Sequence, residues 1–270
     1  SFFCKKNEMK NIYQIGAGMV GSAMAIDLSK NHHLFLADYD LNALKTIQSN
    51  NSNIHTSQLD VTDSEALSEW IAPADIVLLA VPGFLGYKSL KTIINCGKDV
   101  VDISFSPENI LTLDQLAKEK NVTAIVDAGV APGIPNFLLG YWNAKMKINS
   151  FDYCVGGLPK NPSPPYNYKA PFSPIDVIEE YTRPARMMVD SKVITKAALT
   201  DLEIFHFSEV GKLEAFNTDG LRSLLKTMKH IPNMKEKTLR YPGHAKLMQS
   251  MIDEGLFDNN NFDDTVKKLF

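Results

Sequence analysis

Three glycines near the amino terminus have the spacing of a turn that binds a dinucleotide. Gly16, Gly18 and Gly21 form a GxGxxG pattern, which follows a short apolar run and opens a helix-like segment. The first glycine permits a tight turn, the second lets the backbone approach a pyrophosphate, and the third allows a helix to pack closely on a strand. The backbone amides of Met19 and Val20 would begin that helix, where a partial positive charge attracts phosphates.

An acidic residue stands where such a site needs one for the ribose of the cofactor. Asp38 ends the second apolar run, about 20 residues after Gly16. Its carboxylate would accept hydrogen bonds from the ribose hydroxyls and would repel the 2′-phosphate of NADP. No arginine follows it, since the next residues are Tyr39 and Asp40. The pattern therefore predicts NAD, with NADP less favoured, over the alternative that Asp38 only caps the turn into the next helix.

The ends of two later strand-like runs are further candidates for cofactor contacts. In open parallel sheets, ligands bind at the carboxyl ends of the strands. Asp60 and Val61 end the third run and are expected near the adenine, although Asp60 could equally be an acid that begins a helix. Ala80, Val81 and Pro82 end the fourth run and are expected near the ribose on the nicotinamide side.

Strand-like and helix-like segments alternate six times between residues 11 and 127. Because the strand-like runs are continuously apolar, they indicate a parallel sheet with helices on both faces, the doubly wound Rossmann arrangement of the α/β class. We expect an NAD-binding domain over residues 9–131 and an α+β domain for substrate binding or dimerisation over residues 132–270. The second half contains three strand-like runs, at residues 151–155, 186–189 and 203–207.

The composition excludes several classes of partner. A net charge of −3 argues against a surface for nucleic acid or anionic membranes. The three cysteines, Cys4, Cys96 and Cys154, are widely spaced, so neither a disulfide framework nor a zinc site is expected, and a reducing, cytoplasmic location is favoured. No apolar run is long enough to span a membrane, and no clustered histidine and acid pattern predicts a metal. The expected partners are a small molecule and further copies of the chain.

Longer motifs, spread from Lys10 to Leu256, resemble the saccharopine dehydrogenase family and most of all its lysine 6-dehydrogenase branch. The resembling stretches are GAGMVGSAMAIDL from Gly16, DVTD from Asp60, VPGFLGY from Val81, VVDISF from Val100, DAGVAPGIPN from Asp127, VGGLPKNPSPPYNY from Val155, EEYTRPAR from Glu179, GKLEAFNTDGL from Gly211 and KTLRYPGH from Lys237. The resemblance implies a homodimer or homotetramer. Because members are usually longer, the segment that closes their second domain is expected to be missing from this chain.

The resemblance implies NAD(P)-linked oxidation of a carbon–nitrogen bond in a lysine-derived amino acid. In lysine 6-dehydrogenases the nitrogen is the free ε-amine, which leaves as ammonia and yields a semialdehyde. In saccharopine enzymes it is a secondary amine that joins two amino acids. This chain has Ala131 where fungal-type saccharopine reductases carry an acid, and Val155 where they carry a cysteine, with Cys154 one place earlier. These departures favour the lysine 6-dehydrogenase interpretation.

Two alternatives to that interpretation stay open. A saccharopine dehydrogenase or reductase, or a carboxyspermidine-type synthase, would act on a related carbon–nitrogen bond with the same cofactor site. A non-catalytic protein that senses NAD(H) would need the glycine pattern alone. The motifs from Val155 onward count against a sensor, because a sensor does not require a site for a lysine-like molecule.

Binding of an amino acid requires a cation for its carboxylate. Arg183 and Arg240 lie in motifs of the resembling family, and arginine suits bidentate binding of a carboxylate, although a surface salt bridge is its more ordinary role. Lys169 lies in a loop, residues 156–174, that holds six prolines. A long loop of this kind is often functional and could close over a substrate, whereas a solvated lysine is the plainer interpretation of Lys169.

Oxidation of an amine also needs a base that takes its proton and a group that helps water add to the imine. Tyr241 and His244 follow Arg240 and are candidates for a proton relay, although His244 could simply begin a helix. Asp102 and Asp127 end Rossmann strands and are expected to face the cleft. Each of these two acids could be the base, an anchor for the amine or a loop cap.

Overall fold

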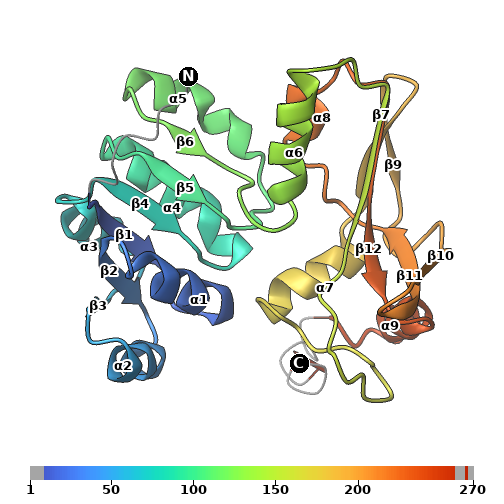
Figure 1. Ribbon diagram of the computed structural model, residues 1–270, viewed down its shortest axis with the longest axis horizontal. Coiled ribbons are helices and arrows are strands. Elements are labelled where there is room, and N and C mark those ends of the chain that lie inside the picture. Colours follow the sequence, from blue (N-terminus) through green and yellow to red (C-terminus); the bar gives the residue numbers. More distant parts are fainter. Residues whose placement is uncertain (1–8, 259–264, 267–270) are drawn as a thin grey trace. The chain divides into compact units, whose positions relative to one another are not determined.

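The computed structural model describes residues 9–258 and 265–266 of the chain (Figure 1). The chain divides into two compact units, the first ending at Gly129 and the second beginning at Val130. The boundary expected from the sequence followed residue 131. Among the described residues, no helix has both the length and the apolar character needed to cross a lipid bilayer.

The first unit is built on a six-stranded sheet with the strand order β3-β2-β1-β4-β5-β6. Every neighbouring pair of strands is parallel. The strands are β1 (Asn11–Ile15), β2 (His33–Asp38), β3 (Ile54–Gln58), β4 (Ile76–Leu79), β5 (Val100–Asp102) and β6 (Ala124–Ile125). The chain runs outward from β1 to β3 and then starts again at β4, which confirms the predicted Rossmann arrangement and places the point of reversal between β1 and β4.

Helices cover both faces of this parallel sheet (Figure 1). They are α1 (Met19–Leu28), α2 (Leu41–Asn50), α3 (Ser64–Ile71), α4 (Gly83–Asn95), the 3-10 helix η1 (Ile110–Leu113) and α5 (Asp114–Glu119). One apolar core joins α3, α4 and η1 to the sheet, and a second joins α1 and α2 to it. Within β1, Ile12 packs in the second core and Tyr13 in the first. Burial on both faces explains why the strands are unbroken apolar runs in the sequence.

The second unit is built on a mixed sheet with the order β10-β11-β12-β8-β9, and β7 pairs in parallel with β12. The strands are β7 (Ser150–Val155), β8 (Ala185–Val189), β9 (Lys192–Lys196), β10 (Glu203–Phe207), β11 (Gly211–Asn217) and β12 (Asn233–Arg240). This confirms the α+β class of the second half. The sequence did not indicate β9, β11 and β12, because charged and polar residues interrupt their apolar pattern.

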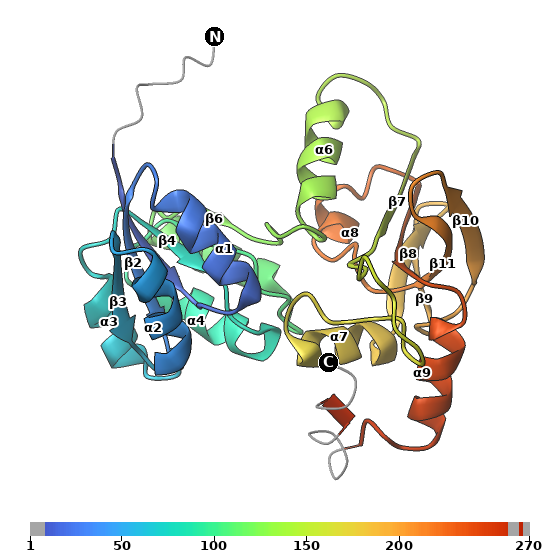
Figure 2. The same ribbon diagram turned by 60° about the horizontal axis from the view of Figure 1, so that its bottom comes forward.

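The helices of the second unit lie at two ends of its sheet (Figure 2). They are α6 (Ile134–Asn143), α7 (Pro174–Thr182), α8 (Leu224–Thr227) and α9 (His244–Asp253). One apolar core lies beneath α6 and α8, and another lies between α7 and α9. Strand β12 connects them, since Met234, Glu236, Thr238 and Arg240 alternate along it and are all buried. That face of β12 is apolar at its start and carries polar and charged groups towards its end.

Candidate functional site

The glycine turn between β1 and α1 has the close contacts that make its glycines necessary. Gly16 has a backbone φ of +106°, and a Cβ atom there would lie 2.1 Å from the carbonyl oxygen of Ala80. A Cβ atom at Gly21 would lie 2.2 Å from the carbonyl oxygen of Gly16. At Gly18, by contrast, a Cβ atom would meet no atom of the described residues within 4 Å. The first and third glycines therefore shape the turn, and the second borders open space that a phosphate could enter.

The start of α1 is open to solvent. Its N-cap residue is Gly18, which has no side chain to satisfy the amides of the first turn. Met19 and Val20 follow, with exposed fractions of 59% and 38%. The predicted phosphate-binding amides are therefore accessible at the end of the helix that carries the partial positive charge.

A buried glutamine that the sequence did not single out forms hydrogen bonds with the backbone of the glycine turn. Gln14, in β1, is fully buried, and its side-chain Nε2 donates to the carbonyl oxygens of Gly16 at 2.9 Å and Gly21 at 2.7 Å. Its Oε1 is buried with no hydrogen-bond partner among the described residues. The amide of Gln14 therefore holds two of the three glycines at a fixed separation. A polar residue inside an otherwise apolar strand is the signal that could have identified it.

Asp38 ends β2 beside this turn, and its carboxylate is held from two sides. One oxygen accepts a hydrogen bond from the backbone N–H of Ala17 at 2.6 Å, and the other accepts one from that of Asp40 at 2.8 Å. Asp40 is the N-cap of α2, because its side chain accepts from the N–H of Asn42 at 2.8 Å. Asp38 therefore does cap the turn that leads into α2, but this is not its only contact, because it also joins the predicted ribose position to the glycine turn.

Asp60 and Val61 follow β3. Asp60 is exposed, and its carboxylate accepts hydrogen bonds from the backbone N–H of Thr62 at 2.9 Å and from its hydroxyl at 2.6 Å. The hydrogen bond from the Thr62 hydroxyl lowers the pKa of Asp60. Helix α3 is capped by Asp63, so the alternative in which Asp60 caps a helix is wrong. Val61 packs against an apolar core.

Ala80, Val81 and Pro82 follow β4 and border the glycine turn. The backbone N–H of Ala80 donates to the carbonyl oxygen of Ile15 at 2.8 Å, which fixes this segment against the end of β1. Val81 packs against the core, and Pro82 is the N-cap residue of α4. The structure therefore brings these three residues to the same sheet edge as Gly16, at the point where the strand order reverses.

The same edge of the first unit carries two buried acids. Asp102 ends β5 and is fully buried; its Oδ1 accepts from the backbone N–H of Ser104 at 2.8 Å, and its Oδ2 has no hydrogen-bond partner among the described residues. Burial raises the pKa of Asp102 to about 6, and the charge of nearby Asp127 adds to this rise. Asp127 follows β6, is buried, and has a φ of +50°. The structure thus brings together both acids predicted from the sequence.

Three small residues that the sequence did not single out, Gly86, Ser104 and Ser106, pack together after β5, and Ser104 contacts Asp102. A Cβ atom at Gly86, in α4, would lie 2.2 Å from the hydroxyl oxygen of Ser106 and 2.8 Å from the Cβ of Ser104. Both serines are buried, and the Ser104 hydroxyl has no hydrogen-bond partner among the described residues. Asp102 is therefore buried beside polar side chains, an environment in which a carboxyl group can exchange a proton near neutral pH.

Arg240, at the end of β12, is the centre of a buried network in the second unit. Its Nη2 donates to the carboxylate of Glu180 at 3.0 Å and to the hydroxyl of Tyr168 at 3.3 Å. Its Nε donates to the hydroxyl of Tyr181 at 3.2 Å, and its Nη1 donates to the carbonyl oxygen of Leu239 at 3.0 Å. The guanidinium carbon lies 4.2 Å from the centre of the Tyr168 ring. With these acceptors inside its own unit, Arg240 has a structural role and little capacity for a substrate carboxylate.

His244 begins α9 and belongs to the same network. Its Nδ1 lies 2.9 Å from the carbonyl oxygen of Tyr166, and its Nε2 lies 2.9 Å from the hydroxyl of Tyr181. A carbonyl oxygen cannot donate, so Nδ1 carries the hydrogen and Nε2 accepts from Tyr181. Burial lowers the pKa of His244 to about 4. The imidazole is therefore neutral at pH 7 with both nitrogens engaged, which argues against the predicted proton relay.

The other residues predicted for the site in the second unit are Tyr241, Arg183 and Lys169. No hydrogen bond given for them reaches the side chain of Arg240 or His244. The hydroxyl of Tyr241 donates to the carbonyl oxygen of Pro159 at 3.0 Å and so fastens the proline-rich loop to the end of β12. Arg183 follows α7 and pairs with Glu179 of that helix. Lys169 is exposed in the loop. Arg240 and His244 share a partner, the hydroxyl of Tyr181.

Two further clusters of polar side chains in the second unit were not predicted. The guanidinium of Arg186 and the carboxylate of Asp219 form a double hydrogen bond, at 2.9 Å from Nε and 2.7 Å from Nη2. Glu236 accepts from the hydroxyl of Thr218 at 2.7 Å and from the N–H of Gly220 at 3.0 Å. Burial raises the pKa of Glu236 to about 8, so this carboxyl group is largely protonated at pH 7.

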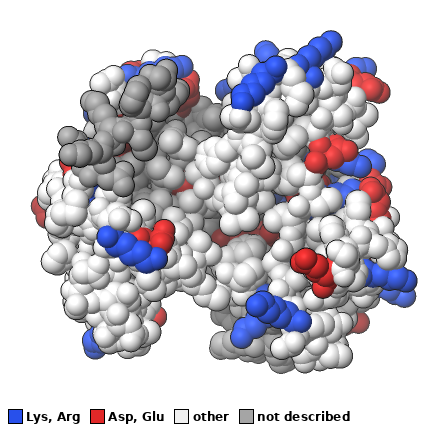
Figure 3. Space-filling model, viewed as in Figure 1, with Lys and Arg blue, Asp and Glu red and all other residues white. Residues whose placement is uncertain are grey.

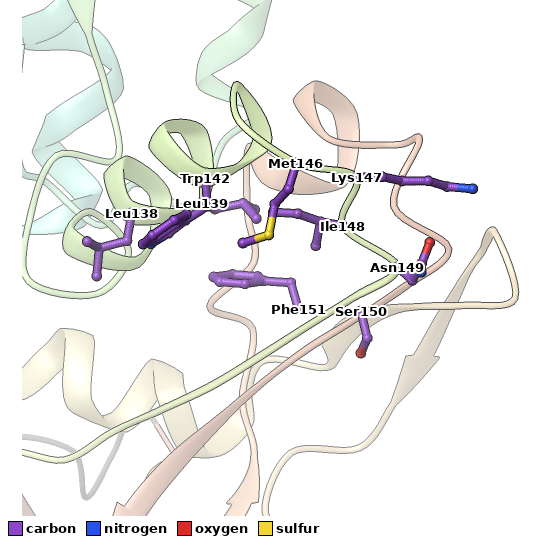
Figure 4. Close-up of a pocket in the computed structure, with 9 residues that line it drawn as sticks. All are labelled: Leu138, Leu139, Trp142, Met146, Lys147, Ile148, Asn149, Ser150 and Phe151. Carbon is purple, nitrogen blue, oxygen red and sulfur yellow. The ribbon is translucent and has the colours of Figure 1, made fainter.

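A cavity of about 350 Å³ lies in the second unit. It is formed by the end of α6, the turn that follows it and the start of β7, with Trp142, Met146 and Phe151 pointing towards one another (Figure 4). No residue predicted for cofactor, substrate or catalysis lines it. On the face of the molecule in Figure 3, charges of both signs are interspersed among uncharged residues, and no broad basic patch is visible there.

Family models match both units. Residues 12–125 match the saccharopine dehydrogenase NADP binding domain, and residues 129–269 match the saccharopine dehydrogenase C-terminal domain. A solved structure of apo saccharopine dehydrogenase (L-Glu forming) from Saccharomyces cerevisiae has the same fold, with a TM-score of 0.70, 24% identity, and coverage of 92% of this chain and 59% of that one.

Curated relatives extend beyond this chain. Saccharopine dehydrogenase (NADP(+), L-glutamate-forming) of Saccharomyces cerevisiae is 26% identical over 271 residues, covering 93% of this chain and 59% of the relative. Alpha-aminoadipic semialdehyde synthase of Arabidopsis thaliana is 26% identical over 242 residues, covering 84% of this chain and 23% of the relative. This chain therefore spans less than two thirds of their length. A pyridine nucleotide agrees with these names, but a preference for NAD finds no support in them.

Proposed function

The chain belongs to the saccharopine dehydrogenase family, and on that premise we propose that it oxidises a carbon–nitrogen bond of a lysine-derived amino acid with a pyridine nucleotide. One observation carries the proposal. A single edge of the parallel sheet holds both an open glycine turn and Asp102, a buried acid whose pKa of about 6 lies close to neutral. The turn suits the diphosphate of the cofactor, and the acid suits proton transfer next to it.

The reaction that fits this arrangement is oxidative deamination. The substrate R–CH2–NH3⁺ loses a proton and a hydride to give the iminium ion, and water then replaces the nitrogen to give the aldehyde R–CHO and NH4⁺. The nicotinamide, when bound, accepts the hydride. Asp102 would take the proton from the amine and assist the addition of water; because its pKa is about 6, its carboxylate form is available above that pH.

We further propose that the substrate is lysine itself and that the cofactor is NAD. Ala131 and Val155 replace the acid and the cysteine of the fungal-type saccharopine reductases, which supports a different amine. Asp38 supports NAD, because its carboxylate already accepts the N–H of Ala17 and would lie close to a 2′-phosphate. Oxidation of saccharopine with NADP is the second candidate, favoured by the names of the relatives.

Absorbance of the reduced nicotinamide tests these proposals directly. The full chain is offered lysine or saccharopine, each with NAD and with NADP. Lysine-dependent formation of NADH supports the first proposal, and turnover of saccharopine alone supports the second. Cofactor binding without turnover of either amine would contradict both and would favour a sensor. Asp38→Ala, with Asp40→Ala as the matched control, should weaken NAD more than NADP, and an unchanged preference would contradict the role of Asp38.

A further inference from the structure

Helix α6 of the second unit is apolar on both of its sides. Residues 134–143, which form it, include no charged residue. On the inner side, Leu139 is buried and packs in the apolar core that α6 shares with α8. On the outer side, Ile134, Phe137 and Tyr141 lie about one turn apart and are exposed. A helix that is apolar all round is normally covered all round, so the outer side of α6 is unusual for a surface helix.

Helix α9 of the same unit shows the usual arrangement. Its inner side carries the buried residues Ala245 and Met248, and its outer side carries Lys246, Gln249 and Ser250, which are exposed and polar. The outer side of α6 offers aromatic and aliphatic groups in their place. Aromatic residues and methionine are enriched, and charged residues are depleted, at the centre of protein–protein interfaces. The composition of α6 is therefore that of an interface.

The apolar surface at α6 and the turn after it is large enough for a specific contact. Since a large side chain covers about 150–250 Å² when fully exposed, six half-exposed ones provide roughly 500 Å² from one chain. Two copies that bury this surface against each other would reach about 1,000 Å², the lower bound for a biological interface, before the surrounding atoms are added. The six side chains, each between 47% and 54% exposed and together called the α6 patch, are those of Ile134, Phe137, Leu138, Tyr141, Trp142 and Met146.

The cavity at the end of α6 gives the patch a place into which an aromatic side chain can insert. Trp142, Met146 and Phe151 point towards one another around this space of about 350 Å³ (Figure 4). Phe137 and Tyr141 lie outside its lining and are exposed on the same helix. One element thus carries both an apolar pocket and apolar projections, which suits a contact between two identical surfaces.

The charges beside the patch are compatible with such a contact. Lys145 follows α6, and its ammonium group lies 3.6 Å from the centre of the Tyr141 ring and donates to the hydroxyl of that residue. Lys147 lines the cavity, but its ammonium group points away from it (Figure 4). In an antiparallel crossing of two α6 helices, the Lys145 side chains of the two copies would lie at opposite ends of the contact, so they would not repel each other at its centre.

We propose that the α6 patch is the surface through which two copies of this chain associate. The two α6 helices cross antiparallel about a two-fold axis, and Tyr141 of each copy enters the pocket of the other. The uncharged outer side, the area and the presence of pocket and projections on one helix support a second copy as the occupant. Because all of these residues belong to the second unit, the inference does not depend on the proposed function.

Sedimentation velocity of the full chain at a series of concentrations tests this surface. The wild-type protein should shift from the mass of one chain to that of two as its concentration rises. Tyr141→Glu places a carboxylate within the contact and can pair with Lys145 at i+4, so the helix is kept while the Kd of dimerisation should rise about 100-fold or more. The matched control is Ile26→Glu in α1, another exposed apolar helix residue with a lysine, Lys30, at i+4, and it should leave this Kd unchanged.

Disulfide cross-linking locates the contact on the molecule. Leu138→Cys lies near the middle of the patch, where the two-fold axis brings the same position of both copies together. Mild oxidation should therefore yield a covalent dimer of Leu138→Cys. Ile26→Cys should yield no more covalent dimer than the wild-type protein does. Equal yields from the two variants would overturn the proposal, because the dimer would then form through another surface.

The mass measurements can also overturn it. A wild-type protein that stays monomeric up to about 100 µM, or a Tyr141→Glu dimer as tight as the wild type, would contradict an interface at α6. If the monomer binds vesicles of anionic lipid and Tyr141→Glu does not, a membrane is the occupant and the proposal is wrong. It is also wrong if the wild type is monomeric and Tyr141→Glu alone lowers the thermal midpoint, since the chain itself then covers the patch. Tyr141→Ala replaces Tyr141→Glu if circular dichroism shows that the latter is unfolded.

Discussion

The two units bury charged groups in opposite ways. In the first unit, Asp102 has an oxygen with no hydrogen-bond partner among the described residues, and the neighbouring charge that shifts its pKa is another acid, Asp127. In the second unit, the buried groups that stay charged meet opposite charges, as in the pairs of Arg240 with Glu180 and of Asp219 with Arg186, whereas the buried acid Glu236 is largely protonated at pH 7. An unpaired acid titrates near neutral pH and can transfer a proton, whereas a paired charge holds geometry. The units differ accordingly in what they contribute, chemistry in one and positioning in the other.

The largest expected effect is the loss of activity when the unpaired acid is removed. Asp102→Asn keeps the shape of the side chain but cannot take a proton, so kcat/KM for the amine should fall about 100- to 10,000-fold. The free energy of unfolding at neutral pH should not fall, because no ion pair is broken and the buried charge that opposes folding above about pH 6 is removed. Steady-state kinetics and urea denaturation measure the two quantities. Activity close to wild type would place Asp102 among structural acids and would remove the contrast between the units.

Breaking a pair in the second unit should affect stability instead. Arg240→Met leaves Glu180, whose side chain is only 18% exposed, without its partner and should lower the free energy of unfolding by about 3–5 kcal/mol. The double variant Arg240→Met/Glu180→Leu should recover much of this loss, because neither charge then remains buried. Urea denaturation of both variants provides the measurement. A double variant as unstable as the single one would show that the hydrogen bonds to Tyr168 and Tyr181, and not the ion pair, carry the stability.

The pH dependence of stability sharpens the same comparison, because two buried groups act with opposite signs. His244 has a folded pKa lowered to about 4, so the unfolded chain binds more protons between about pH 4 and pH 6.5, and stability rises with pH there. Asp102 has a folded pKa raised to about 6, so the folded chain binds more protons between about pH 4 and pH 6, and stability falls with rising pH.

Variants of these two residues should therefore change the slope in opposite directions. Over that window, His244→Gln should make the slope of unfolding free energy against pH less positive, and Asp102→Asn should make it more positive. Urea denaturation at a series of pH values measures each slope. Slopes that shift in the same direction would contradict the assignment of one group, and a slope unaffected by His244→Gln would show that the imidazole is not shielded from water.

The smallest expected effect concerns the support of the glycine turn. Gln14→Met removes the hydrogen bonds to Gly16 and Gly21, so the Kd of NADH should rise by about 5- to 30-fold if each bond contributes about 1 kcal/mol to the bound geometry. Stability should change less, since the variant also removes the buried Oε1 that has no partner. Fluorescence titration with NADH measures the affinity. An unchanged Kd would mean that the turn keeps its shape without this glutamine.

The site residues of the first unit were easier to predict from the sequence than those of the second unit. Gly16, Gly21 and Asp38 could be identified because local backbone geometry restricts a tight turn to glycine and places the acid at the next strand end. In the second unit, Arg186 lies 33 residues from Asp219 and Arg240 lies 60 residues from Glu180. No local spacing indicates such pairs, because the sheet pairing that brings them together is itself non-local.

Strand β12 shows why that sheet was hard to predict. Lys235 and Lys237 lie on one side of it and Glu236 and Arg240 on the other, so its sequence has neither an apolar run nor a clean alternation of apolar and polar residues. The burial of these charges depends on partners such as Glu203, which lies 2.6 Å from Lys237. The sequence therefore indicated the class of the second unit from its other strands, while its central strand and its ion pairs required the structure.

The hydrogen-bond network of Arg240 has a consequence for the local unfolding of the second unit. One guanidinium bonds to Tyr168 in the proline-rich loop and to Glu180 and Tyr181 in α7, and Tyr181 in turn bonds to His244 at the start of α9. None of these segments can leave without breaking a buried hydrogen bond to another. Amide hydrogens in α7, in α9 and around Tyr168 should therefore exchange with solvent at a common rate, as one cooperative unit, although more than 70 residues separate its ends.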